Sequence, residues 1–331
     1  MRPEHALTSC VSFAAVTFAQ LLPVWPEYKL TDSYVGFDFY KRFTWQVIDD
    51  PTNGRVNYVN KTTAQTGNLT FASEDYFVMR ADHSTVVAPG ARGRDSVRIQ
   101  SQDVYKDVML ILDLSHMPEG CSTWPAWWTL SKEGPWPHGG EIDIIEGVNL
   151  ASTNLASLHT TPDCNMTQYR SQKGTTTSTV CDTSYNGNQG CGTSFNTSTS
   201  YGTAFNQAGG GYYVMERDGK KGISMWFMQR STDSLLRDVI DPNVISRSTP
   251  DAFFPTQENC NYQEHFDDHQ IVFDLTFCGD WAGASWGGEC AEKAPSCKDF
   301  VNDHPDEFSE AYWEIKSLQI YTRESDSLLE W

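Results

Sequence analysis

Three carboxylates lie close together in the stretch 139–147, which reads Gly-Gly-Glu-Ile-Asp-Ile-Ile-Glu-Gly. In a regular β-strand, side chains alternate between the two faces, so Glu141 and Asp143 would share one face and Glu146 would point to the other. One β-bulge adds a residue to the strand and resets this alternation. We therefore expect a bulged strand, with Glu141, Asp143 and Glu146 on one face and the isoleucines between them in the core.

Two carboxyl groups at a suitable spacing can hydrolyse a glycosidic bond. A retaining mechanism needs them about 5–5.5 Å apart, and an inverting one about 6.5–9.5 Å apart. With the bulge, Glu141 and Glu146 are effectively four strand steps apart, which is about 13 Å between Cα atoms. If each side chain leans inward by about 3.5 Å, the carboxyl groups are about 6 Å apart, which favours retention without excluding inversion. The charge of Asp143 between them can keep one glutamate protonated as a general acid.

Two less specific interpretations of these acids stay open. The first is a solvated acidic strand face, and the second is a cation site built from carboxylate oxygens. An isolated Glu-x-Asp pair would favour either of them. The complete string, preceded by Gly139-Gly140 and by a tryptophan cluster, is more specific and favours catalysis.

Strands are the elements that must position these acids, because helical periodicity is scarce in the sequence. Short runs of alternating, β-branched or aromatic residues, bounded by Gly, Pro, Asn and Asp, predict an all-β sandwich or barrel. These runs are residues 76–80, 96–100, 108–114, 142–145, 211–217, 223–228, 270–277 and 312–321. The stretch 160–206, rich in Thr, Ser, Gly and Asn, predicts a long disulfide-linked loop, and 282–296 looks similar. We expect a short helix within 299–310.

Composition and charge restrict the class of protein. The chain has 331 residues, of which 24 are basic and 43 acidic, for a formal charge of −19. This balance makes nucleic acid an unlikely partner, since phosphate binding needs clustered Lys and Arg. No apolar stretch beyond the N-terminus approaches the roughly 20 residues of a membrane span. We expect one domain over 27–325, without a membrane partner and acting as a monomer.

The N-terminus and the cysteines predict secretion. Residues 1–19 have the layout of a signal peptide, although an ordinary apolar segment is the alternative. Removing Cys10 with the signal leaves eight of nine cysteines, an even number that is consistent with four disulfides. Among these, Cys290 and Cys297 could close a short loop, whereas a zinc site is less favoured because no Cys-x-x-Cys pair is present. Four Asn-x-Ser/Thr sequons offer glycan acceptors, at Asn60, Asn68, Asn165 and Asn196.

Eleven tryptophans are many for this length. The apolar faces of pyranose rings stack on flat aromatic side chains, so tryptophans are natural sugar platforms. Strand parity predicts Trp127 in the core and Trp128 at the substrate cleft, since neighbouring residues point to opposite faces. Trp136, shortly before the acidic strand, could form a wall of the cleft. For any single tryptophan, ordinary core packing is the alternative.

The acidic string resembles the catalytic signature of glycoside hydrolase family 16 in its bulged, laminarinase-like form. Further stretches from about residue 28 to 321 look like fungal members that act on β-1,3-glucans. They are 54–59 (GRVNYV), 93–99 (GRDSVRI), 124–126 (WPA), 158–161 (LHTT) and 276–283 (TFCGDWAG). The resemblance implies a concanavalin-like jelly roll with a concave substrate cleft. It also implies a retaining endo-1,3(4)-β-glucanase. We expect no cofactor and no metal in the site, and a structural cation on the far side of the sandwich stays open.

The resemblance also assigns roles to individual residues. Glu141 would be the nucleophile, Glu146 the acid/base and Asp143 the assisting carboxylate. The residues that would contact substrate are Trp128, Trp136 and Trp281, which stack on sugar rings, and Asn57, Arg94 and His159, which make polar contacts. For Arg94 the alternative is a salt bridge with Asp95 or another acid, and for His159 a structural hydrogen bond.

Two further functions are compatible with the same sequence. A transglycosylase on this scaffold would use a sugar hydroxyl instead of water as the acceptor. A lectin-like glucan-binding module would use the same fold without catalysis, because fold alone does not determine function. The complete pair Glu141 and Glu146 favours an enzyme, since a binding module needs neither.

Overall fold

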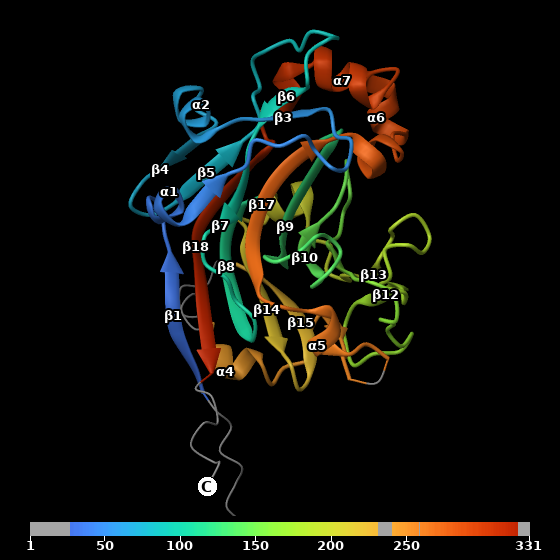
Figure 1. Cartoon of the computed structure of the whole chain (residues 1–331). Helices are drawn as coiled ribbons and strands as arrows, with labels where there is room; N and C mark the ends of the chain where they lie inside the picture. Colours follow the sequence, from blue (N-terminus) through green and yellow to red (C-terminus); the bar gives the residue numbers. More distant parts are fainter. Residues whose placement is uncertain (1–26, 231–239, 258, 324–331) are drawn as a thin grey trace, which may run out of the picture.

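The computed structural model describes residues 27–230, 240–257 and 259–323, so the expected signal peptide at 1–19 and Cys10 lie outside the described residues. Figure 1 shows a β-sandwich built from two large antiparallel sheets, with short helices at the ends. This arrangement confirms the predicted all-β sandwich. None of the helices in the described ranges combines the length and the apolarity that a membrane crossing requires.

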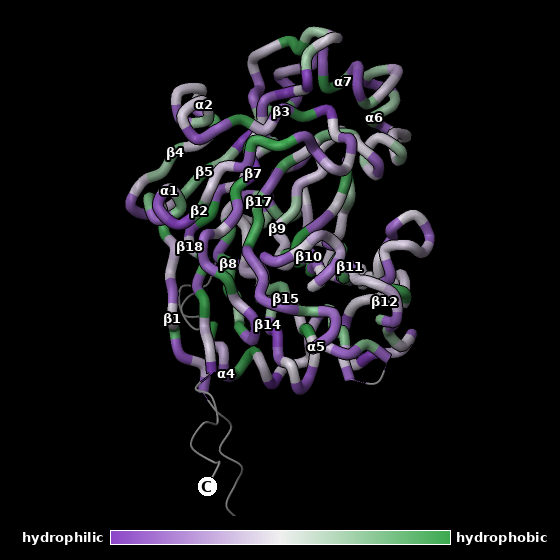
Figure 2. The backbone as a smooth tube through the Cα atoms, viewed as in Figure 1, coloured by the Kyte–Doolittle hydropathy of each residue, from purple (hydrophilic) through white to green (hydrophobic). Residues whose placement is uncertain are grey.

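The first sheet has eight strands, in the order β16-β15-β14-β8-β18-β5-β4, with β1 paired to β18. Their bounds are β1 Tyr28–Tyr34, β4 Thr70–Ala72, β5 Phe77–Arg80, β8 Val108–His116, β14 Gly211–Asp218, β15 Gly222–Gln229, β16 Ala252–Phe254 and β18 Tyr312–Arg323. In Figure 2 the central strand β8 is largely hydrophobic, whereas the edge strand β1 is largely hydrophilic.

The second sheet also has eight strands, in the order β12-β13-β11-β10-β9-β17-β7-β2. Their bounds are β2 Phe43–Trp45, β7 Arg98–Ser101, β9 Thr123–Ser131, β10 Glu141–Glu146, β11 Leu155–His159, β12 Thr175–Ser178, β13 Cys191–Ser194 and β17 His269–Phe277. All eight runs that the sequence predicted as strands are strands in the structure.

A small parallel pair and several short helices complete the fold. The pair is β3 Val56–Tyr58 with β6 Arg94–Ser96. The helices are α1 Asp38–Arg42, α2 Lys61–Thr66, α3 Gly202–Gln207, α4 Pro242–Ile245, α5 Tyr262–His265, the π-helical turn η1 Gly279–Gly283, α6 Gly288–Lys293, α7 Cys297–Asp303 and the 3₁₀ turn η2 Pro305–Phe308.

The main core lies between the two sheets, where alternate side chains of each strand meet. Leu110, Leu112 and Leu114 of β8 pack in the same cluster as Trp127 of β9 and Phe273 of β17. Trp127 is fully buried and its ring stacks on Phe273 with the centroids 5.9 Å apart, which confirms its predicted place in the core. The opposite face of the second sheet is therefore free to carry polar residues.

Four disulfides form from the eight cysteines in the described ranges, as predicted from their number. They are Cys121–Cys290, Cys164–Cys260, Cys181–Cys191 and Cys278–Cys297. The predicted loop between Cys290 and Cys297 is wrong, because Cys290 within α6 pairs with Cys121 and Cys297 at the start of α7 pairs with Cys278. These two bridges attach the α6–α7 segment to the ends of β9 and β17.

Three local predictions differ from the structure. The stretch 282–296 is not all loop, since it contains α6. The helix expected within 299–310 begins earlier, at Cys297, because the Ser296 hydroxyl caps it by accepting a hydrogen bond from the Asp299 N–H. The long stretch 160–206 contains the short strands β12 and β13 and the helix α3 beside its disulfide-linked loop.

Candidate active site

The predicted bulge is present in β10. Asp143 pairs with Trp128 of β9, whereas Ile145 pairs with the next residue, Trp127, so that Ile144 is the extra residue. On the other side, the register with β11 shifts between Asp143 and Glu146. The three isoleucines of β10, residues 142, 144 and 145, are completely buried in the main core. The bulge thus turns the three carboxylates to the face opposite the core, which is called the catalytic face below.

Asn154, which directly precedes β11, holds the bulge in place. Its side-chain Nδ2 donates a hydrogen bond to the Ile144 carbonyl (2.8 Å), and its Oδ1 accepts one from the Glu146 N–H (3.1 Å). Asn154 is completely buried. One amide side chain therefore satisfies both backbone groups that the extra residue removes from the ladder with β11.

Asn154→Ala should damage both stability and catalysis. It leaves a buried N–H and a buried carbonyl unpaired, so we expect the free energy of unfolding to fall by about 1–3 kcal/mol. A displaced Glu146 should lower kcat/KM by about 10²-fold. Asn154→Asp is the matched variant, because it keeps the acceptor for Glu146 but cannot donate to Ile144. Urea unfolding and kcat/KM on a soluble glucan measure both effects, and wild-type values for Asn154→Ala would contradict the anchoring role.

Each of the two glutamates accepts a hydrogen bond from an indole. Trp136 Nε1 donates to Glu141 Oε2 (2.7 Å), and Trp124 Nε1 donates to Glu146 Oε1 (2.8 Å). Trp136 is 46% exposed, which leaves much of its ring available beside Glu141. Trp124 meets Trp281 of η1 edge to face, with ring centroids 5.6 Å apart. The structure thus places an aromatic wall beside each carboxyl group.

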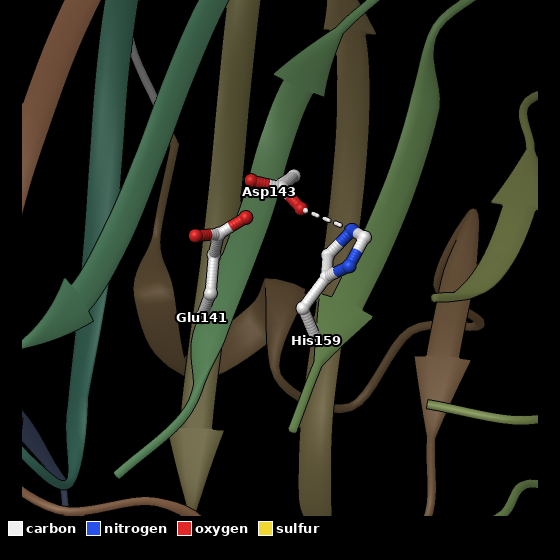
Figure 3. A group of neighbouring side chains, drawn as sticks. All are labelled: Glu141, Asp143 and His159. Carbon is white, nitrogen blue, oxygen red and sulfur yellow. Dashed lines mark ion pairs between the residues drawn. The ribbon is translucent and has the colours of Figure 1, made fainter. Parts of the chain in front are cut away.

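The side chain of Asp143 contacts a histidine of the neighbouring strand (Figure 3). Asp143 Oδ2 is 3.4 Å from His159 Nε2, and both residues are largely buried. The other ring nitrogen of His159, Nδ1, is 2.9 Å from Asn188 Oδ1. An amide oxygen can only accept, so Nδ1 carries the ring proton and Nε2 faces Asp143. Burial lowers the pKa of His159, which favours the neutral ring.

A fourth buried carboxylate, Asp274 of β17, belongs to the same face. Ala126 of β9 pairs with Glu146 on one side and with Asp274 on the other, so the two acids flank a small residue. Asp274 Oδ2 accepts from Arg98 Nη1 of β7 (3.2 Å), and the Arg98 guanidinium lies over the Trp128 ring, 4.8 Å from its centroid. Trp128 is 9% exposed, so it lines this face mainly beneath Arg98.

Burial raises the pKa of every carboxyl group in this cluster. It raises the pKa of Glu141 to about 7, opposed by the hydrogen bond from Trp136 and the charge of Arg98. It raises the pKa of Glu146 to about 7, opposed by Trp124 and His159. The pKa of Asp143 is raised well above its usual range by burial and by the charges of the two glutamates. The site therefore retains protons near neutral pH, as a general acid requires.

Removing each indole donor should move a different limb of the pH–rate profile. Trp124→Phe removes a bond that lowers the pKa of Glu146, so an acid at Glu146 stays protonated to higher pH and the alkaline limb of kcat/KM moves up. Trp136→Phe raises the pKa of Glu141, so a nucleophile there ionises later and the acidic limb moves up. Profiles of kcat/KM against pH measure both shifts. If Trp124→Phe moved the acidic limb and Trp136→Phe the alkaline limb, Glu146 would be the nucleophile and Glu141 the acid/base.

Not all residues expected to contact substrate lie at this cluster. Arg94 is completely buried, and its guanidinium donates to the carbonyls of Asp82, Thr85 and Val301 at 2.6–3.1 Å and lies over Phe308. Its acidic neighbour is Asp82, with Nη1 and Oδ2 3.9 Å apart. The structure thus gives Arg94 a bracing position, and we leave it out of the proposed substrate contacts.

The hydrogen bonds of Asn57 join it to residues at the β3–β6 pair. Its Nδ2 donates to Asp95 Oδ1 (2.6 Å), and it lines a cavity of about 270 Å³ beside β3 and β6.

The sequence did not predict all partners of the carboxylates themselves. Trp124 could have been found, because it shares its strand parity with Trp128. Asp274 and Arg98 could not, since only the register across β7, β17 and β9 brings them to Glu146.

Comparison with known proteins agrees with this geometry. Residues 43–321 match the family model described as the XgeA-like catalytic domain of GH16. A probable glycosidase of Schizosaccharomyces pombe is 41% identical over 299 residues, which are 89% of this chain and 69% of that protein. A probable endo-1,3(4)-β-glucanase of Aspergillus clavatus is 36% identical over 94% of this chain, and the chain spans only 49% of that relative.

Two solved structures are also similar. One is laminarinase 16A of Phanerochaete chrysosporium with β-glucans in its donor and acceptor sites, which has 45% identity and a TM-score of 0.83 and covers 89% of this chain and 99% of the other. The second is an elongating family 16 β-1,3-glucosyltransferase, with 39% identity, a TM-score of 0.79, and coverage of 89% and 100%. With its bulged acidic strand and its jelly-roll sandwich, the chain belongs to glycoside hydrolase family 16.

Proposed function

We propose that this glycoside hydrolase is a secreted, retaining endo-β-glucanase that cleaves β-1,3-glucosidic bonds and accepts mixed β-1,3/1,4-glucans. One observation carries this proposal: Glu141 and Glu146 lie on one face of a bulged strand, each half-buried, each with a raised pKa and each bound by an indole donor. The β-glucans in the sites of the Phanerochaete laminarinase support the substrate class.

The first step forms a covalent glycosyl-enzyme. Glu141 in its ionised form, which the hydrogen bond from Trp136 and the charge of Arg98 favour against burial, attacks the anomeric carbon while Glu146 donates its proton to the departing glycosidic oxygen. Glu146 holds that proton at neutral pH because burial and the negative charges of Glu141 and Asp274 raise its pKa. Breaking the bond transfers one proton from Glu146 and leaves Glu146 as a carboxylate.

The second step returns both glutamates to their starting states. Glu146, now ionised, removes a proton from water as the water attacks the anomeric carbon and displaces Glu141. Two inversions at the same carbon retain the β configuration. Asp143, between the two glutamates, limits how many of the three groups can ionise together, and its Oδ2 lies 3.4 Å from His159 Nε2. Trp136, Trp281, Trp128 and His159 are the proposed substrate contacts.

Transglycosylation is the second candidate, in which a sugar hydroxyl replaces water in the second step. The Trp124–Trp281 pair beside Glu146 favours it, because an aromatic platform at the acid/base side can hold an acceptor sugar. The elongating glucosyltransferase among the similar structures points the same way. A binding module without catalysis is disfavoured, since buried carboxyl groups on a substrate face are costly without a chemical use.

Secretion and the domain boundaries are part of the same proposal. We propose that residues 1–19 are a signal peptide, that 27–325 form the catalytic domain and that the enzyme acts as a monomer. The four disulfides are consistent with an oxidising compartment. All four sequon asparagines are exposed, as glycan attachment requires.

A product profile on purified glucans tests the proposed function. The enzyme is incubated with laminarin, lichenan and a β-1,4-glucan, with Glu141→Gln as the inactive control, and the oligosaccharides are separated over time. Short internal fragments from laminarin and lichenan, and none from the β-1,4-glucan, are expected. Products longer than the starting chains would favour transfer over hydrolysis. Cleavage of the β-1,4-glucan alone would contradict the proposed specificity.

A further inference from the structure

Three side chains of the catalytic face could hold a metal ion. Glu141, Asp143 and His159 each offer one ligand atom, and these atoms all lie within 4.8 Å of one another. They come from adjacent strands, and Glu141 is directly opposite His159 in the register of β10 with β11. In Figure 3 the carboxylate of Asp143 points toward the imidazole of His159, and the carboxylate of Glu141 lies beside that of Asp143. The set combines two oxygens and one nitrogen.

The contact between Asp143 and His159 lacks a positive centre. The His159 ring directs its Nδ1–H at Asn188 Oδ1, so in the neutral ring the Nε2 lone pair faces the carboxylate. Asp143 Oδ2 has no hydrogen-bond partner in the described part of the chain, and Asp143 is only 3% exposed. When Asp143 is ionised, two electron-rich atoms at 3.4 Å therefore face each other inside the protein, and either a proton on Asp143 or a cation between the two atoms relieves their repulsion.

The distance between these two atoms suits zinc. Bonds from Zn²⁺ to imidazole nitrogen and carboxylate oxygen are about 2.0–2.2 Å, which separates two ligands of a tetrahedral ion by about 3.3–3.6 Å. The observed separation of Asp143 Oδ2 and His159 Nε2 is 3.4 Å. Asn188 accepts from the second ring nitrogen, which is the contact that usually orients a metal-binding histidine.

The donor set also selects among metal ions. Ca²⁺ takes six to eight oxygen ligands and Mg²⁺ keeps several waters, so neither matches a compact site with an imidazole. Zn²⁺ accepts mixed nitrogen and oxygen ligands and binds three protein groups with one open position. The surrounding charge is negative as well, because Glu146 and Asp274 lie near Asp143 and raise its pKa.

We propose that Glu141, Asp143 and His159 form a Zn²⁺ site, and that Zn²⁺ bound there inhibits the enzyme reversibly. The metal would use the carboxylate of Glu141 as a ligand, which removes it as a nucleophile, and would occupy the space of the sugar at the point of cleavage. Glucan and Zn²⁺ therefore exclude each other. The binding site itself does not depend on the proposed reaction, only its inhibitory effect does.

Isothermal titration of the full chain with ZnCl₂ tests the site without any turnover. We expect one Zn²⁺ per chain, with affinity lowered at least about 100-fold by His159→Gln and about 10–100-fold by Asn188→Ala, which removes the orienting contact. CaCl₂ should give no comparable binding. A laminari-oligosaccharide should compete with Zn²⁺, so the apparent Zn²⁺ affinity should fall as the oligosaccharide concentration is raised.

His116→Gln is the matched control variant. His116 Nε2 also contacts a carboxylate, Glu310 Oε2 at 3.2 Å, but no third ligand joins this pair within the described residues. The Zn²⁺ affinity of His116→Gln should equal that of the wild type. Glu141→Gln provides a second test that keeps the shape of the site, and it should also lower the affinity for Zn²⁺. Melting curves verify that each variant is folded.

The possible results separate the two proposals. Wild-type Zn²⁺ affinity in folded His159→Gln and Glu141→Gln, or no binding of ZnCl₂ to the wild type at millimolar concentration, would overturn the metal site whatever the enzyme hydrolyses. Zn²⁺ binding that requires His159 in a chain that cleaves no glucan would support the site and contradict the proposed function instead.

Discussion

Glu141→Gln should lower kcat on laminarin by about 10⁴-fold or more while leaving glucan affinity within a few-fold of the wild type. The amide has the shape of the carboxylate, so it can still accept a hydrogen bond from Trp136, whose Nε1 is 2.7 Å from the Glu141 oxygen. It cannot form a glycosyl ester, however, and the covalent step is lost. Initial rates and equilibrium binding to laminari-oligosaccharides measure the two effects separately.

The matched control for this variant is Glu74→Gln, the same chemical change at an exposed position far along the chain from β10. It should retain wild-type kcat and KM. A folded Glu141→Gln enzyme with near-normal turnover would remove Glu141 from the role of nucleophile. A parallel loss of binding would instead assign Glu141 to holding the substrate.

Glu146→Ala should be selective for the leaving group. A general acid contributes about 10²–10⁴-fold, and this contribution matters most when the departing oxygen is a poor leaving group. Hydrolysis of glucans should therefore fall by about that factor, whereas the first-turnover burst of an activated phenol from an aryl β-glucoside oligomer should be nearly unchanged. Later turnovers should be slow, because Glu146 no longer assists the attack of water on the glycosyl-enzyme. The truncation also removes the acceptor of the Trp124 hydrogen bond and opens space beside the anomeric carbon.

Added azide should restore turnover in Glu146→Ala. A small anion that needs no general base can enter the opened space and displace Glu141 from the glycosyl-enzyme, giving a β-glycosyl azide. Mass spectrometry and NMR of the products detect it. An equal loss of rate on glucans and on activated aryl substrates, without any azide product, would contradict Glu146 as the acid/base.

The strands and the bulge could be predicted because they depend on local sequence. Alternation of apolar and polar residues identified β8, β14, β15, β17 and β18 to within a few residues of their observed ends. The Glu-Ile-Asp-Ile-Ile-Glu string required a bulge if all three acids were to share a face. The isoleucines on its other face are buried in the core, as that argument demands.

The groups that tune the acids could not be predicted, because they come from distant parts of the chain. Asp274 reaches Glu146 only through the register of three strands, and Ala126 between them matters because it is small. Likewise, Asn154 could be recognised as the anchor of the bulge only once its amide was seen to bind both Ile144 and Glu146. The sequence shows which residues are present but not which distant segments of the chain contact them.

The position of Arg94 could not be predicted from the sequence either. An arginine within a glucanase-like stretch was expected to contact sugar, but carbonyls from residues 82, 85 and 301 converge on its guanidinium and bury it. The cysteine pairing differed for a similar reason. Cys290 and Cys297 are near neighbours in sequence, yet α6 and α7 direct them to Cys121 and Cys278.

The configuration of the first product tests the central claim most directly, namely that one bulge places Glu141 and Glu146 close enough to act on the same glycosidic bond in two displacements. Proton NMR spectra are recorded within the first minutes of laminarin cleavage, before the released reducing ends mutarotate. The account predicts that the β anomer appears first and the α anomer only later. Initial release of the α anomer would contradict it, because it would mean that water attacks directly and that Glu141 never bonds to the sugar.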